Sequence, residues 1–200
     1  MRWHSLFAAI AIVAATCTSF AAEKSPIGKK IDSFTLQDYR GKEHALKDRN
    51  ASKLVVIAFL GTECPLAKLY GPRLAKLAKE YEGKEVAFLG IDSNTQDQIT
   101  AIAAYARIHE IDFPILKDLG NKVADQFGAQ RTPSVYVLDG ERTIRYAGRI
   151  DDQYGIGFQK DKPASNDLTN ALNELLEGKK VTKSETEAPG CFIGRARDAK

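Results

Sequence analysis

Cysteine is the residue type in this 200-residue chain with the most distinctive chemistry, and Cys64 has the most suggestive surroundings. It follows a run of apolar residues and precedes Pro65, a residue that favours the first turn of a helix. Free backbone N–H groups and the positive end of the helix dipole stabilise a thiolate at such a position. Since the thiolate is the nucleophilic form, we expect Cys64 to be reactive. The alternative is a small, buried, apolar cysteine at the end of a strand.

Two charged residues near Cys64 act on its thiol in opposite directions. Lys68, one helical turn further on, favours the thiolate, whereas the carboxylate of Glu63 raises the pKa of the thiol and offers a route for a proton. The helix position and Lys68 together outweigh Glu63 in this interpretation. We therefore predict a net lowering of the Cys64 pKa.

The first 22 residues have the layout of a secretory signal peptide. Arg2 supplies a positive charge, residues 6–15 form an apolar run, and Ser19-Phe20-Ala21 ends it with small residues at alternate positions. We predict cleavage near Ala21 or Ala22 and an exported protein, periplasmic or extracellular. An uncleaved anchor and a lipoprotein attached at Cys17 are the alternatives.

Removal of the signal peptide would leave two cysteines, Cys64 and Cys191, which permits one disulfide. Cys191 follows Pro189-Gly190 in a polar C-terminal tail, residues 179–200. If the tail folds back, Cys191 can resolve an adduct formed at Cys64. The alternatives are a free surface thiol and a thiol paired with another chain.

Apolar periodicity predicts the elements that position these cysteines. Strands are expected over residues 33–36, 44–46, 53–60, 86–91, 113–116, 134–138 and 143–147, and helices over 65–83, 99–108, 123–128 and 167–176. Right-handed crossovers between the middle strands make them parallel, and the last hairpin extends the sheet antiparallel. Because the central strands are apolar throughout, helices must cover both faces.

Four stretches resemble the thioredoxin superfamily, and in particular its redoxin branch, which includes alkyl hydroperoxide reductase/thiol-specific antioxidant proteins and exported thiol-disulfide oxidoreductases. They are residues 32–42, 55–65, 113–128 and 131–139. The resemblance implies an α/β thioredoxin-like fold over residues 26–178, with a central mixed sheet, helices on both faces and an N-terminal β-hairpin.

The resemblance also implies roles for residues around Cys64. Pro133 would follow a cis peptide bond that turns the Thr132 backbone toward the cysteine, and Thr132, Pro133, Arg131 and Pro65 would hold the substrate. The alternative for Pro133 is a trans proline that opens a strand.

The chain departs from the patterns of both sub-families. The second cysteine of a C-x-x-C pair would stand at Ala67, and the hydroxyl that peroxiredoxins carry three residues before the cysteine would stand at Gly61, one residue before Thr62.

Three hypotheses for the function therefore stay open. The first is an exported thiol-disulfide oxidoreductase that uses Cys64 as its single nucleophile. The second is a peroxiredoxin-like, antioxidant thiol peroxidase in which Thr62 or Arg131 supplies hydrogen-bond donors. The third is a redox-silent binding module.

Composition argues against several other classes of function. The 29 basic and 26 acidic residues nearly balance, at a net charge of +3, and no dense basic run predicts nucleic-acid binding. After signal cleavage only His44 and His109 remain as histidines, so we expect no metal site and no cofactor. No membrane span is expected after the signal peptide. The expected partners are protein or small-molecule disulfides and thiols, or hydroperoxides.

Overall fold

The computed structural model of this protein describes residues 25–195. The predicted signal peptide, with Cys17, lies outside the described residues. Within residues 25–195 we find no helix with the length and apolar character that crossing a membrane requires.

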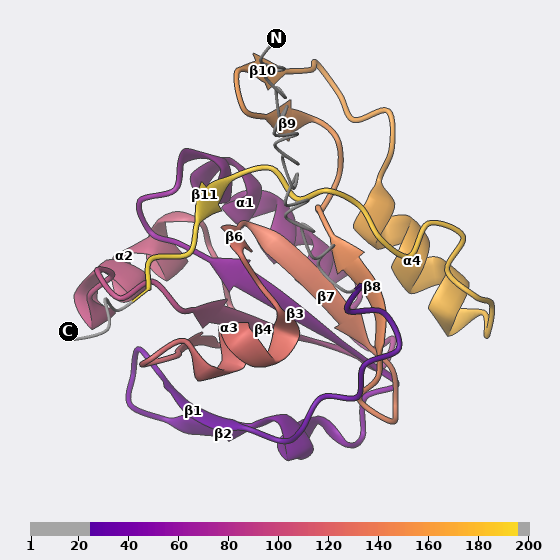
Figure 1. Cartoon of the computed structure of the whole chain (residues 1–200), viewed down its shortest axis with the longest axis horizontal. Coiled ribbons are helices and arrows are strands. Elements are labelled where there is room, and N and C mark those ends of the chain that lie inside the picture. Colours follow the sequence, from indigo (N-terminus) through magenta and orange to yellow (C-terminus); the bar gives the residue numbers. More distant parts are fainter. Residues whose placement is uncertain (1–24, 196–200) are drawn as a thin grey trace, which may run out of the picture.

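A seven-stranded mixed sheet forms the centre of the molecule, in the order β2-β1-β5-β4-β3-β7-β8 (Figure 1). Strands β3, β4 and β5 are parallel, whereas β7 and β8 continue the sheet antiparallel, as predicted. The N-terminal hairpin of β1 and β2 joins the sheet through β5. The bounds are β1 Thr35–Asp38, β2 Glu43–Ala45, β3 Leu54–Leu60, β4 Val86–Asp92, β5 Ile115–Lys117, β7 Ser134–Leu138 and β8 Ile144–Gly148.

Helices cover both faces of this sheet, which confirms the predicted α/β, thioredoxin-like fold class. They are α1 Pro65–Glu80, α2 Ile99–Ile108, α3 Lys122–Phe127 and α4 Asp167–Leu176, with a 3-10 turn, η1, at Leu46–Arg49. Alternate residues of β3 point to opposite faces, so that Val56 packs with α1, α2 and α4 while Ile57 packs with α3. Every residue of β3 is buried, as a central strand covered on both sides requires.

Four two-residue strands were not predicted, because so short a stretch carries no periodicity. They are β6 Arg131–Thr132, β9 Tyr154–Gly155, β10 Phe158–Gln159 and β11 Cys191–Phe192. Strand β9 pairs with β10, and β11 pairs antiparallel with β6. The pairing of β11 brings the C-terminal tail back across the carboxyl end of β3, where Cys64 lies (Figure 1).

Candidate active site

Cys64 occupies the turn between β3 and α1, as the N-cap residue of the helix. Its backbone is extended, and its carbonyl accepts a hydrogen bond from Lys68 N at 3.0 Å. Pro65 opens the helix, where a missing N–H costs nothing. The Cys64 residue is only 4% exposed, and its Sγ donates to the Thr132 carbonyl at 2.9 Å. The sulfur therefore lies directly against β6.

The opposite wall of the site is β6 with Pro133, whose peptide bond to Thr132 is cis, as predicted. Strand β11 pairs with β6 on the side that Cys64 faces, with Cys191 directly opposite Thr132. Cys64 and Cys191 therefore meet around one backbone residue, although more than a hundred residues separate them in the sequence. Both thiols are free.

The two thiols have opposite pKa shifts. Burial by itself raises the pKa of Cys64, but hydrogen bonds from the Cys191 thiol, from the Ala67 and Cys191 backbone N–H groups and from the Thr132 hydroxyl outweigh burial and lower it. Burial, and then the hydrogen bond and negative charge of Cys64, raise the pKa of Cys191 to about 11. Cys64 is therefore the more acidic thiol of the pair, and Cys191 keeps its proton to higher pH.

The predicted lowering of the Cys64 pKa is confirmed, but its causes differ in part from the predicted ones. The Ala67 N–H lies in the first turn of α1, as the helix argument requires. Glu63, in contrast, has a side chain that is 76% exposed and pairs with Lys68 at 3.2 Å. The charges of this pair offset each other in solvent, where ion pairs contribute little. The other contributions come from Cys191 and Thr132.

Two threonine hydroxyls in the segments that form the site are buried without a hydrogen-bond partner among residues 25–195. They belong to Thr62, whose backbone N–H donates to Asp97 Oδ2 at 2.8 Å, and to Thr132. While the Cys64 thiol donates to the Thr132 carbonyl, the Thr132 hydroxyl is unused, and it can turn toward the sulfur once that is a thiolate. Unsatisfied buried hydroxyls are uncommon, and the one on Thr132 is close enough to Cys64 to donate to its thiolate.

Gly61 is glycine because no side chain fits there. A Cβ at this position would lie 2.5 Å from Asn94 Nδ2 and 3.0 Å from Thr132 Oγ1. The hydroxyl that the peroxiredoxin pattern places at residue 61 is therefore sterically excluded. The Thr132 hydroxyl occupies the adjacent space instead.

The side chain of Arg131 contacts the C-terminal tail. Its Nη1 donates to the Gly190 carbonyl at 2.7 Å, and its guanidinium lies 4.0 Å from the centre of the Phe192 ring. Such a cation–π contact stabilises the pairing of β11 with β6. The predicted substrate-binding role of Arg131 remains a proposal for a state in which the tail has moved.

A buried polar cluster beneath the active-site turn was missed in the sequence. Asp97 accepts from Thr62 N and Asn94 Nδ2, and Asp92 pairs with Lys117 Nζ at 2.9 Å. Burial is the main reason why the pKa of Asp92 is raised to about 8, and a hydrogen bond with Asp97 adds to it. The pKa of Asp97 is lowered, because its hydrogen bonds outweigh its burial. The titrations of the two carboxyls are therefore coupled, and Asp92 is the carboxyl that keeps a proton to higher pH.

This cluster also anchors the C-terminal tail. Asn94 Oδ1 accepts from Gly194 N at 2.8 Å, and Thr95 N donates to Gly194 O at 3.0 Å. The only sign of these residues in the sequence was the stretch Asp92-Ser93-Asn94-Thr95, which resembles a set of helix-capping oxygens.

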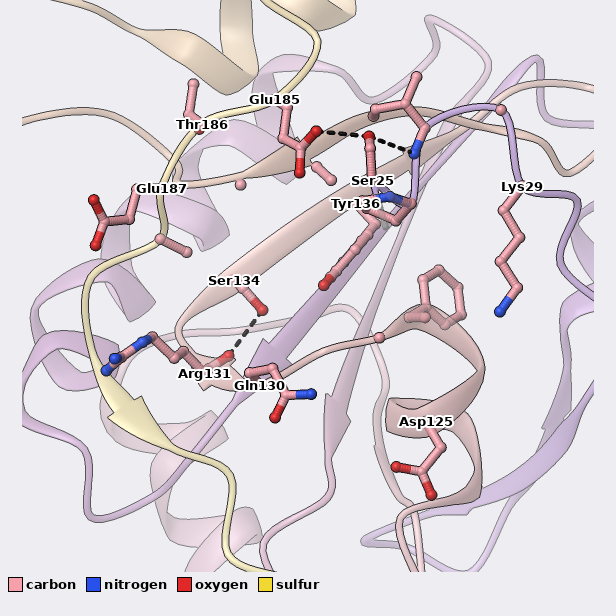
Figure 2. Close-up of a pocket in the computed structure, with 18 residues that line it drawn as sticks. Ser25, Lys29, Asp125, Gln130, Arg131, Ser134, Tyr136, Glu185, Thr186 and Glu187 are labelled. Atoms are coloured by element: carbon pink, nitrogen blue, oxygen red, sulfur yellow. Dashed lines mark hydrogen bonds between the residues drawn. The ribbon is translucent and has the colours of Figure 1, made fainter. Parts of the chain in front are cut away.

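A cavity of about 770 Å³ lies on the other side of the tail. Figure 2 shows Arg131, Ser134 and Tyr136 on one side of it and the tail residues Glu185 and Glu187 on another. Neither cysteine lines this cavity, so the cavity and the pair of thiols are separate features of the structure. Among residues 25–195 no three His, Cys, Asp or Glu side chains are grouped to hold a metal ion.

Comparison with known proteins adds an independent line of evidence. The AhpC/TSA family model matches residues 27–147. The Thiol-disulfide oxidoreductase ResA of Bacillus thuringiensis (strain Al Hakam) is 29% identical over 122 residues, covering 61% of this chain and 69% of that protein. The crystal structure of the hypothetical protein SMc02350 from Sinorhizobium meliloti 1021 superposes with a TM-score of 0.79 at 29% identity, over 87% of this chain and 97% of that one.

A third comparison concerns the fold alone. The thioredoxin domain of the thiol-disulfide oxidoreductase BVU-2223 from Bacteroides vulgatus superposes with a TM-score of 0.58 at 15% identity, over 76% of this chain and 99% of that chain. At this level of identity the likeness identifies the thioredoxin fold.

Proposed function

The chain belongs to the AhpC/TSA family and is a thiol oxidoreductase, and we propose that it exchanges disulfides, with Cys64 as the attacking thiolate and Cys191 as the resolving thiol. The observation that carries this proposal is the thiol pair itself. Cys64 has a lowered pKa, and Cys191, hydrogen-bonded to it, has a pKa raised to about 11. One sulfur is thereby prepared to attack and the other to hold a proton until it is needed.

The exchange balances in two steps. The Cys64 thiolate attacks one sulfur of a partner disulfide, which forms a mixed disulfide and releases the other partner sulfur as a thiolate. The released thiolate takes the proton of Cys191, and the Cys191 thiolate then attacks Cys64 Sγ. This attack releases the second partner sulfur as a thiolate, which takes a proton from solvent, so the products are the Cys64–Cys191 disulfide and a partner reduced to two thiols. The reverse sequence oxidises a partner dithiol.

A second candidate, peroxide reduction, is favoured by the unsatisfied hydroxyl of Thr132, which lies against Cys64. The Cys64 thiolate would attack one oxygen of a hydroperoxide, becoming a sulfenic acid and releasing an alcohol or water after protonation. Condensation with Cys191 would release water and form the same disulfide. An external dithiol must then reduce that disulfide. The third hypothesis, a redox-silent binding module, is not retained, because the chain is a thiol oxidoreductase.

Export and domain organisation belong to the same proposal. The signal-peptide layout of residues 1–22 supports an exported oxidoreductase, periplasmic or extracellular, with a redoxin domain over residues 26–178 and a tail over 179–200 that carries Cys191. The relatives named thiol-disulfide oxidoreductase support protein thiols or disulfides as the substrate class.

The test compares the wild type with Cys64→Ser and Cys191→Ser, each treated separately with a protein disulfide and with hydrogen peroxide. Intact mass, with peptide mapping to exclude Cys17, reports the outcome. We expect the wild type to lose about 2 Da through a link between Cys64 and Cys191, Cys191→Ser to accumulate a mixed disulfide, and Cys64→Ser to form neither. Oxidation by peroxide but not by the protein disulfide would favour the second candidate. An unreactive Cys64 would refute both.

A further inference from the structure

The edge of β6 that faces Cys64 is already occupied by the protein's own chain. Cys191 lies opposite Thr132 and Phe192 opposite Arg131, and Ile193 N donates to the Gln130 carbonyl at 2.9 Å. A strand edge offers one row of backbone donors and acceptors, so it pairs with one extended segment at a time. Any second segment that pairs here must first displace β11.

The occupying segment, residues 184–194, is hereafter the strap. It is fastened at both ends: Ala147 N donates to Ser184 O at 2.9 Å and Thr186 N to Ala147 O at 3.0 Å, while Gly194 is held by Asn94 and Thr95. Figure 1 shows it in yellow, running from α4 across β6 toward α2.

Between these ends the strap lies in direct contact with β6. Gly190 packs so closely that a Cβ there would lie 2.1 Å from Thr132 O and 2.8 Å from Thr132 C. Ile193 is 5% exposed, whereas the ring of Phe192 lies on Arg131 and is 69% exposed. The strap is therefore fitted to β6 through its backbone and one small residue, as an added strand would be.

We propose that the strap is an intramolecular competitor of the substrate, and that the substrate is an extended, cysteine-containing peptide segment of a partner protein that pairs with β6 in the same register. The inference rests on the proposed function, since it takes the partner's disulfide as the group that Cys64 attacks. In that register a cysteine opposite Thr132 brings its sulfur to the place where the Cys191 sulfur now meets Cys64.

The strap also displays the side chains that this edge accepts. Its sequence is Gly190-Cys191-Phe192-Ile193, and each position has a reason in the contacts described above. The residue before the cysteine must be glycine, because the Thr132 carbonyl leaves no room for a Cβ. An aromatic residue after it meets Arg131, and an aliphatic residue after that is buried. We infer the same small–Cys–aromatic–aliphatic preference for the partner segment.

Because of this competition, the access of a partner segment to β6 depends on whether Cys64 and Cys191 are oxidised or reduced. A Cys64–Cys191 disulfide fixes the strap on β6, so the oxidised protein presents its disulfide only to a thiol that reaches Cys64 or Cys191 from outside. In the reduced protein the strap is held by hydrogen bonds and packing alone. A partner segment can then exchange with it.

The test uses Gly190→Ala, which forces the strap off β6 while keeping both cysteines. Gly83→Ala is the matched control, since Gly83 also has a positive φ but nothing within 4 Å of its Cβ position. The probe is a synthetic peptide, Thr-Glu-Ala-Pro-Gly-Ser-Phe-Ile-Gly-Arg, which is the strap sequence from residue 186 to residue 195 with serine for cysteine. Binding is measured by fluorescence anisotropy on the reduced full-length proteins.

We expect the peptide to bind Gly190→Ala about tenfold more tightly than the wild type or Gly83→Ala, as the cost of overpacking one methyl group predicts. Alkylation of Cys64 by iodoacetamide, read on its own tryptic peptide at a pH high enough to ionise the thiol without the Cys191 hydrogen bonds, should accelerate by a similar factor. A probe with alanine before the serine should lose this binding. Phe192→Ala, at a largely exposed ring, provides a milder variant with an intact fold and should increase binding by a few-fold.

Equal binding by wild type and both strap variants would overturn the proposal. Faster alkylation without peptide binding would also overturn it, because the strap would then be a cover and not a competitor. Neither readout requires turnover. Failure of the Cys64–Cys191 link to form under oxidation would therefore refute the proposed function while leaving the strap result to stand by itself.

Discussion

Oxidation of the Cys64–Cys191 pair should stabilise the folded protein by about 3 kcal/mol. The bond would close a loop of more than a hundred residues, for which the chain-entropy model gives about 4.7 kcal/mol. Against this, the Cys64 thiolate loses the hydrogen bonds that lower its pKa, a charged acceptor being worth about 1.5 kcal/mol or more. Because Cys64 Sγ already lies against the Thr132 carbonyl and β11 already pairs with Cys191 opposite Thr132, we expect little added strain.

The assay is thermal unfolding of the oxidised and the reduced protein, followed by far-ultraviolet circular dichroism. For a chain of this length about 3 kcal/mol corresponds to a rise of roughly 6–12 °C in the unfolding midpoint. The same two conditions applied to Cys191→Ser provide the control, whose midpoint should not respond to oxidant. A wild-type midpoint that stays constant or falls, while mass spectrometry shows the disulfide present, would refute the reasoning. The bond would then be strained, or the strap would have to leave β6 to form it.

Three further predictions concern the groups around the pair. Cys191→Ala should shift the pH profile of Cys64 alkylation to higher pH than Cys191→Ser does, because serine keeps a hydrogen-bond donor for the thiolate and alanine does not. The raised Asp92 pKa means that the folded state binds a proton more tightly than the unfolded state, so stability should fall as pH rises from about 5 toward about 8. Asp92→Asn should flatten this dependence in urea titrations at several pH values, and an unchanged slope would contradict the assignment. Asp97→Ala should cost about 2 kcal/mol in the same titrations by leaving the buried Thr62 N–H unpaired, whereas Asp97→Asn, which keeps an acceptor, should cost less.

The sheet could be predicted from the sequence because its strands carry their own signal. A run such as residues 54–60, apolar at every position, is buried on both faces wherever it lies in a parallel sheet. The two-residue strands β6 and β11 carry no such signal. Their pairing depends on the turn at Pro133 and on the path of the tail, so the return of Cys191 to Cys64 could be proposed as one alternative, but its pairing opposite Thr132 could not be predicted.

The direction of the Cys64 pKa shift was predictable from the sequence, but only part of its cause was. The helix N-terminus next to Cys64 is visible in the sequence through Pro65, and the pKa is indeed lowered. The exposure of Glu63 depends on packing that no local pattern records. The buried acids Asp92 and Asp97 were hidden for the same reason, since the lysine that pairs with Asp92 comes from a different strand.

The strap explains how the chain can work with Ala67 at the position of the second C-x-x-C cysteine. In a C-x-x-C pair both sulfurs lie on one helix turn, so the pair remains together whatever occupies the substrate edge. Here the second sulfur is carried by the segment that itself pairs with that edge, opposite Thr132. A partner segment on β6 and Cys191 next to Cys64 are then mutually exclusive in space. The resolving step must therefore follow at least partial release of the partner segment, which makes the return of the strap part of the reaction. Slowing that return, as Gly190→Ala does, should lengthen the life of the mixed disulfide even though both thiols are intact.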